Sequence, residues 1–185
     1  MRFTSTILAF LLTSATYAIA APSLALVAPR AALNITDPLP PTDEHVACDF
    51  EAAEKYPDDI ARLQSIAIKN YAYLLLVKKD VHAAFDAFVP GPVYIQHNPN
   101  VVSGREPIIE ALAGGLWTVP DLVFDHVMAW AGEGYGLVHY RAWAREGAVH
   151  LSVMDRVRFQ GTCIVEHWDL MQSITGKEPN PEAWF

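Results

Sequence analysis

"SVMDRVRFQGTCIVEHWD", residues 152–169, contains two runs of alternating apolar and polar residues on either side of Gln160-Gly161. This pattern predicts an antiparallel hairpin with a two-residue loop. Counting outward from that loop places Asp155 opposite Glu166 on a mostly apolar face. Two carboxyl groups would then have Cβ atoms about 5 Å apart, so at least one is expected to be protonated or matched by a cation.

The rest of the chain predicts what packs against this hairpin. From Leu122 onward, further reversals at Glu133-Gly134 and Glu146-Gly147 separate runs rich in Val, Phe, Tyr, Trp and Ile, which indicates four antiparallel strands. Counting from the Glu146-Gly147 turn sets Val138 opposite Asp155. Earlier segments predict a helix from Pro57 to Leu74, a helix at 80–89, a short strand at 93–97 and a helix at 105–116. The fold class is therefore α+β, with a curved antiparallel sheet packed against N-terminal helices.

Length and composition favour a single globular domain. The 185 residues are 52% hydrophobic and 18% charged, and the formal net charge is −8. An acidic chain is repelled by nucleic acid and by anionic membranes, so neither is an expected partner. No GxSxG motif, phosphate-binding loop or dinucleotide-binding fingerprint occurs in the sequence.

The N-terminal region has the layout of a secretory signal. Residues 1–20 combine an arginine, an apolar run and small residues before the expected cleavage position. Residues 21–47 are rich in proline and predict a linker or pro-segment, 48–175 form the domain, and 176–185 form a C-terminal tail. The protein is therefore expected to be secreted or to reside in the secretory-pathway lumen, where Asn34 is a glycosylation sequon.

Cys48 and Cys163 are the two cysteines of the chain. In an oxidising compartment they are expected to form a disulfide between the N-terminal segment and the last strand. The alternative is that they are two unrelated small core residues.

Histidines supply the candidate bases. His97 alternates with Val93 and Ile95 and is expected on their apolar face, whereas the predicted register puts His139, His150 and His167 on the opposite face. A metal site is another interpretation of these residues, because histidines and carboxylates are ligands for zinc or iron. The register splits these groups between two faces and the sequence has no HExxH spacing, so no metal is predicted.

"YIQHNPNVVSGREPIIEAL" (94–112) and "VMDRVRFQGTCIVEHWDLMQ" (153–172) resemble the SnoaL-like polyketide cyclase family, within the superfamily named for nuclear transport factor two. The resemblance covers roughly residues 58–173. It implies a cone-shaped sheet around a deep apolar pocket, and a homodimer. A more distant similarity to ketosteroid isomerase implies that Asp155 is a neutral acid facing an oxyanion, that His97 occupies the position of the base, and that Tyr71 stands near an oxyanion tyrosine.

These inferences together predict a secreted, cofactor-independent cyclase or isomerase that removes a proton alpha to a carbonyl group. His97 would be the base, Asp155 would hydrogen-bond the enolate oxygen, and Glu166 would return the proton. The ligand would be a small hydrophobic or aromatic carbonyl compound, bound by Tyr71, Trp117, Tyr140 and Trp168. The alternative is a non-enzymatic secreted carrier of a hydrophobic small molecule.

Overall fold

The structure is a computed structural model that describes residues 43–91, 93–144, 149–180 and 182–185. Of the two units of the chain, all described residues belong to the second, Leu33–Phe185. The expected signal segment, the sequon at Asn34 and the expected Glu146-Gly147 turn lie outside the described residues. The domain boundaries inferred from the sequence therefore remain predictions.

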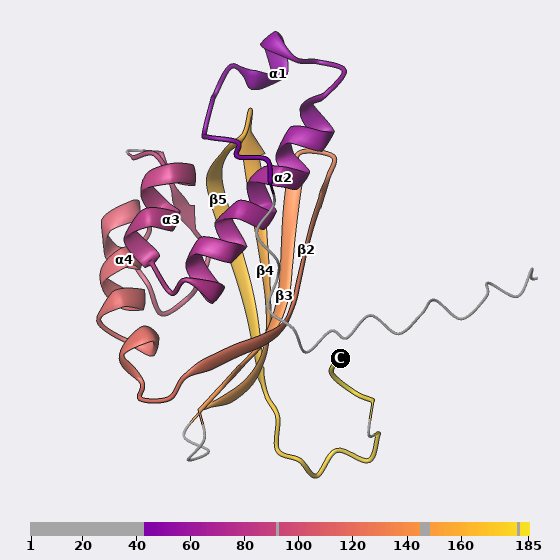
Figure 1. The fold of residues 1–185 in the computed structure, drawn as a ribbon. Coiled ribbons are helices and arrows are strands. Elements are labelled where there is room, and N and C mark those ends of the chain that lie inside the picture. The colour runs from indigo at the N-terminus through magenta and orange to yellow at the C-terminus, as the bar shows by residue number, and fades with distance from the viewer. Residues whose placement is uncertain (1–42, 92, 145–148, 181) are drawn as a thin grey trace, which may run out of the picture. The chain divides into compact units, whose positions relative to one another are not determined.

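The second unit contains one five-stranded sheet with helices on one of its faces (Figure 1). The helical elements, in chain order, are α1 (Ala52–Lys55), α2 (Ile60–Ala72) continuing as the π-helix η1 (Tyr73–Val77), α3 (Val81–Phe88), α4 (Arg105–Ala113) and the 3-10 helix η2 (Leu116–Thr118). The strands are β1 (Ile95–Gln96), β2 (Val123–Gly132), β3 (Tyr135–Trp143), β4 (His150–Gln160) and β5 (Cys163–Ser173). The expected α+β class is confirmed.

The sheet order is β1-β5-β4-β3-β2, and one detail of the expected sheet is wrong. β2 to β5 form the expected antiparallel meander, but β1 pairs with β5 in parallel, so the sheet is mixed. β1 and β5 are far apart in sequence and α4 lies between them, so this pairing does not come from a hairpin. The register of β2 against β3 shifts between Asp125 and Met128, where His126 has a φ of 53°. Such bulges bend a strand.

Helix positions follow local signals in the sequence. Asp80 caps α3 because its side chain accepts a hydrogen bond from the backbone N–H of Ala83 at 2.9 Å. Gly114 follows the last residue of α4, as expected from the paired glycines there. α2 packs against β2 and β3, and its helical periodicity buries Ala67 and Tyr71, which are one turn apart, on the face toward the sheet.

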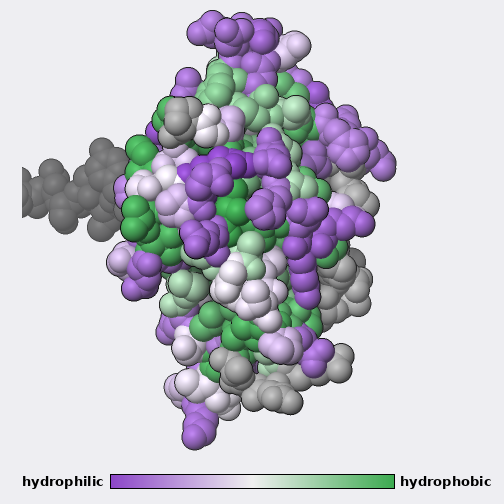
Figure 2. All heavy atoms as spheres, turned by 90° about the vertical axis from the view of Figure 1, so that its left-hand side faces the viewer, coloured by the Kyte–Doolittle hydropathy of each residue, from purple (hydrophilic) through white to green (hydrophobic). Residues whose placement is uncertain are grey.

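The core lies between the helices and the inner face of the sheet, which is the face that the helices cover. Its largest fully buried side chains include Ile68 and Leu76 from the helical layer, and Val138 and Val157 from the sheet. On the side where Figure 1 places α3 and α4, hydrophobic residues form small patches between hydrophilic ones (Figure 2). Within the described residues, no helix has both the length and the hydropathy needed to cross a membrane.

The register between β3 and β4 agrees with the sequence analysis. Val138 pairs with Asp155, Tyr140 with Val153, and Ala142 with Leu151. All but Leu151 are buried, so this face of both strands points toward the helices. The inward position of Asp155 is therefore confirmed.

The register between β4 and β5 is not the expected one. Gln160 pairs with Cys163, so the loop is Gly161-Thr162 rather than Gln160-Gly161. Gly161 has a φ of 59° at the first loop position, as a type II′ turn requires. Phe159 then pairs with Ile164 but Arg158 with Glu166, which leaves Val165 as an extra residue. The predicted pairing of Asp155 with Glu166 is wrong, because this bulge exchanges the two faces of β5 beyond it.

The N-terminal segment is bonded to this turn. The Thr162 hydroxyl accepts a hydrogen bond from the backbone N–H of Asp49 at 2.8 Å and donates to the Ala47 carbonyl at 2.7 Å. Cys48 and Cys163 form a disulfide with a Cα–Cα distance of 4.4 Å. The disulfide links positions 115 residues apart and fixes the start of the domain to its last strand.

Gly136 of β3 gives a stability prediction. A Cβ at this position would lie 2.9 Å from Ile68 Cδ1 and from Val157 Cγ2, and both of these side chains are fully buried in the core. We expect Gly136→Ala to lower the free energy of unfolding by about 1 to 3 kcal/mol through overpacking. Urea denaturation measures this loss, and Gly132→Ala is the matched control because a Cβ there meets nothing within 4 Å. Equal stabilities of the two variants would contradict the prediction.

Candidate functional site

A cavity of about 180 Å³ lies between the inner face of the sheet and the helical layer. It is smaller than the roughly 300 to 1,000 Å³ that is typical for drug-sized ligands, so it suits a small molecule. Most of its wall is apolar or aromatic, with polar side chains from α2, from β3, β4 and β5, and from the segment 94–98 that contains β1. The polar side chains of the lining include those of Tyr71, Gln96, Asn98, Tyr140, Asp155, His167 and Asp169.

Asp155 and His167 form the central acid–base contact of the cavity. Asp155 is 8% exposed, and its Oδ1 lies 3.3 Å from His167 Nε2. β4 and β5 hold the two groups together, since Val157 pairs with His167 and Asp155 with Asp169 two residues further along. Contacts of this kind are often long without a ligand and shorten when one binds.

The other nitrogen of His167 has a defined proton. His167 Nδ1 lies 3.0 Å from Gln96 Oε1, and the same oxygen accepts a hydrogen bond from the backbone N–H of Asn98 at 3.1 Å. An atom that accepts from a backbone N–H must be the amide oxygen, so His167 Nδ1 is the donor. His167 Nε2 therefore faces the Asp155 carboxyl group, an arrangement suited to general acid–base chemistry.

Tyrosine hydroxyls complete the polar part of the cavity. Burial, with the nearby Asp155 carboxylate as the next cause, raises the pKa of Tyr71 and of Tyr140 far above the ordinary tyrosine value. Tyr140 also hydrogen-bonds the Asp155 carboxylate, and as a phenol it is the donor in that bond. Both tyrosines thus remain neutral hydrogen-bond donors at any physiological pH.

These raised pKa values give a titration prediction. Burial also raises the pKa of Tyr94, so three of the seven tyrosines are expected to remain protonated in the folded protein above pH 10. Only the unfolded chain releases these protons near the ordinary pKa of about 10, so the free energy of unfolding should fall as pH rises beyond that value. Phenolate absorbance measures the ionised fraction. Titration of all tyrosines together in the folded protein, as in denaturant, would contradict the prediction.

A second carboxyl group lies beside the pair. Asp169 pairs with Asp155 across β4 and β5, and its Oδ2 accepts a hydrogen bond from Asn98 Nδ2 at 2.6 Å. The two facing carboxyl groups expected from the sequence therefore exist on the inner face, but the partner of Asp155 is Asp169 and not Glu166.

His97 and Glu166 lie on the outer face of the sheet, away from the helices, and the expected convergence of both with Asp155 is wrong. His97 does alternate with Val93 and Ile95, but these two residues are 54% and 42% exposed, so their shared face is the solvated one. His97 Nε2 bonds Glu166 Oε1 at 2.8 Å. The hydrogen bond from Arg158, followed by that from His97, lowers the pKa of Glu166, which is consistent with an exposed ion-pair cluster.

Trp168 also lies on the outer face, so its expected role in ligand binding is wrong. Its ring stacks on His97 with a centroid distance of 4.5 Å, and the Arg156 guanidinium lies 4.1 Å from its centroid. The three other residues expected to bind ligand, Tyr71, Trp117 and Tyr140, do line the cavity. Trp117 is held in place because its Nε1 donates to the Leu75 carbonyl at 3.2 Å.

His167 was assigned to the wrong face by the predicted register, and Gln96, Asn98 and Asp169 were not identified from the sequence. The signal that could have found them is the run Cys163-Ile164-Val165, in which three consecutive residues are apolar. All three are buried in the structure. Three adjacent buried residues break the period of two and mark a bulge. Shifting the alternation by one residue after Val165 places His167 and Asp169 inward.

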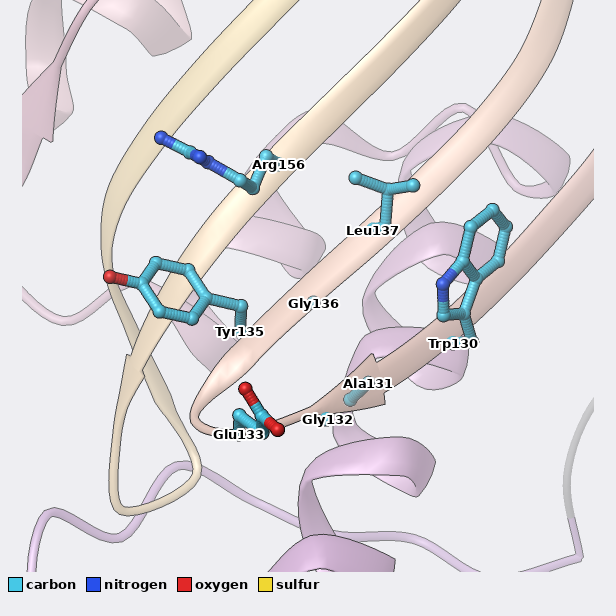
Figure 3. Close-up of a pocket in the computed structure, with 8 residues that line it drawn as sticks. All are labelled: Trp130, Ala131, Gly132, Glu133, Tyr135, Gly136, Leu137 and Arg156. Atoms are coloured by element: carbon cyan, nitrogen blue, oxygen red, sulfur yellow. The ribbon is translucent and has the colours of Figure 1, made fainter. Parts of the chain in front are cut away.

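A second hollow of about 390 Å³ lies on the outer face, beside the turn between β2 and β3 (Figure 3). Trp130, Tyr135, Leu137 and Arg156 stand around it, and the two aromatic residues are 46% and 42% exposed. No acid–base pair faces this hollow among the described residues, so the inner cavity is the better candidate for chemistry. In the part of the chain that the structure covers, no group of three His, Cys, Asp or Glu side chains is placed to hold a metal ion.

Comparisons with known proteins give structural similarity alone. No protein-family model matches the chain, and no curated protein matches its sequence. Similar solved structures include an NTF2-like protein of unknown function from Mesorhizobium loti (19% identity, 64% of this chain and 98% of that chain, TM-score 0.49) and TsrD from Streptomyces laurentii (15%, 68% and 91%, 0.46). Another is a steroid delta-isomerase from Pseudomonas aeruginosa (16%, 71% and 87%, 0.45).

Proposed function

We propose that this protein is a cofactor-independent isomerase or cyclase that moves a proton at a carbon alpha to a carbonyl group. The observation that carries this proposal is the 3.3 Å contact between Asp155 Oδ1 and His167 Nε2 inside a mostly apolar cavity. The low polarity of the wall strengthens hydrogen bonds to a developing negative charge, because bulk water is excluded.

The proton balance assigns a role to each group. With Asp155 protonated, its O–H donates to the substrate's carbonyl oxygen, and Nε2 of neutral His167 is released to accept the α-proton. The resulting imidazolium has an acceptor for each N–H, namely Gln96 Oε1 and the Asp155 carboxyl group. Tyr140 donates to Asp155 and orients its carboxyl group toward the cavity. His167 then returns the proton to a different atom, which completes an isomerisation, an aldol-type cyclisation or a dehydration.

The setting of the protein is part of the proposal. The disulfide between Cys48 and Cys163 supports a secreted protein or one of the secretory-pathway lumen, because such bonds persist in oxidising compartments. The size and lining of the cavity support a small hydrophobic or aromatic carbonyl compound as ligand. The expected homodimer stays a prediction.

Hydrogen–deuterium exchange of a small ketone tests the proposal. Acetophenone has exchangeable methyl protons alpha to its carbonyl group, so the protein in D₂O is expected to accelerate their loss from the proton NMR spectrum. Binding is measured separately by ligand-observed NMR. Binding with an exchange rate equal to that in buffer would contradict the proposal and favour the alternative, a carrier of hydrophobic small molecules.

A further inference from the structure

Two polar atoms of the cavity wall are buried without a hydrogen-bond partner among the described residues. They are Gln96 Nε2, a donor, and Asp169 Oδ1, an acceptor, and both residues line the same cavity. Gln96 is 7% exposed. Buried polar groups are nearly always paired, so an unmatched donor and an unmatched acceptor in one cavity point to a ligand.

The donor cannot be removed by turning the amide. Gln96 Oε1 already accepts from the backbone N–H of Asn98 and from His167 Nδ1. Exchanging the amide oxygen and nitrogen would direct N–H groups against two donors, which is unfavourable. Both N–H bonds of Gln96 Nε2 therefore remain directed away from these partners.

The acceptor lies close to the donor in the fold. Gln96 pairs with His167 across β1 and β5, and Asp169 follows His167 by two residues on the same face of β5. Asn98 Nδ2 donates to Asp169 Oδ2, and Asp169 Oδ1 has no donor among the described residues. We call Gln96, Asn98, His167 and Asp169 the polar end of the cavity.

We propose that the polar end binds a second functional group of the ligand, one that carries an acceptor and a donor side by side, as in a carboxamide, a carboxylic acid or an enol. The acceptor oxygen takes a hydrogen bond from Gln96 Nε2, and the O–H or N–H donates to Asp169 Oδ1. This inference rests on the proposed function, in which Asp155 and His167 act on a separate carbonyl group. The substrate class is then a small ketone with a second, hydrogen-bonding carbonyl or enol group.

A pair of shape-matched probes tests the polar end without requiring catalysis. Benzamide has an acceptor and a donor, whereas α-methylstyrene has nearly the same shape and neither. We expect Gln96→Leu to shift the ratio of their dissociation constants by about fivefold against benzamide, the value of one neutral hydrogen bond. Asp169→Asn is expected to shift it by about tenfold or more, since a hydrogen bond to a carboxylate is stronger.

Two further variants make the result interpretable. Gln64→Leu is the matched control, because Gln64 is as buried as Gln96 but donates to the Gly161 carbonyl outside the cavity, so the ratio should not change. Gln96→Glu keeps an oxygen for His167 Nδ1 and Asn98 N–H and removes the donor, so the ratio should shift as in Gln96→Leu. Circular dichroism confirms folding of each variant.

The outcomes separate this inference from the proposed function. An unchanged ratio in either Gln96→Glu or Asp169→Asn overturns the inference. Equal binding of both probes by the wild-type protein also overturns it, because water alone then satisfies the two atoms. Acetophenone exchange would still stand in that case. If the variants show the expected shifts but the wild-type protein does not catalyse exchange, the polar end is supported and the catalytic proposal is rejected.

Discussion

Replacing His167 by glutamine is expected to reduce α-proton exchange by at least about two orders of magnitude, the usual contribution of a positioned general base. Glutamine keeps a hydrogen-bonding side chain of similar length, but it cannot accept a proton. His167 Nε2 is the only nitrogen base directed at Asp155 among the described residues, so no neighbour can replace it. The measurement is the acetophenone exchange rate at saturating ligand.

His97→Gln is the control for this prediction. It makes the same substitution on the outer face, where His97 bonds Glu166 and stacks on Trp168, and the exchange rate should stay within about twofold of wild type. A loss of exchange in His97→Gln together with retention in His167→Gln would reject the assignment and restore the roles expected from the sequence.

Removing the disulfide is expected to have the largest effect on stability. Its loop spans 115 residues, for which the chain-entropy model gives about 4 to 5 kcal/mol of stabilisation. That value is a large part of the roughly 5 to 15 kcal/mol that keeps a domain folded. We therefore expect a Cys48→Ser, Cys163→Ser double variant to unfold at much lower urea concentration than wild type.

Reduction of the wild-type protein is the control, because it breaks the disulfide and opens the same loop without substituting any residue. The double variant and the reduced protein should lose similar free energy of unfolding. A loss below about 1 kcal/mol in both would show that the hydrogen bonds of Thr162 with Ala47 and Asp49 hold the N-terminal segment without the bond.

Alternation in the sequence was sufficient where strands pair without interruption. The pairing of Val138 with Asp155 followed from counting residues, because each step along a strand reverses the side-chain direction. The same count failed on β5, since the extra residue Val165 exchanges the faces. That one residue turns His167 and Asp169 toward the cavity, whereas His97 lies outward because it shares the solvated face of Val93 and Ile95.

The amino-acid sequence by itself determined the α+β class, the helices before a meander and the inward position of Asp155. These properties follow from local periodicity, capping residues and composition, which act over a few neighbouring residues. Only the tertiary structure decided which groups share the cavity with Asp155, because the parallel pairing of β1 with β5 and the bulge at Val165 depend on contacts between distant segments. The energy of such contacts depends on how whole strands pack, and no short stretch of sequence contains it.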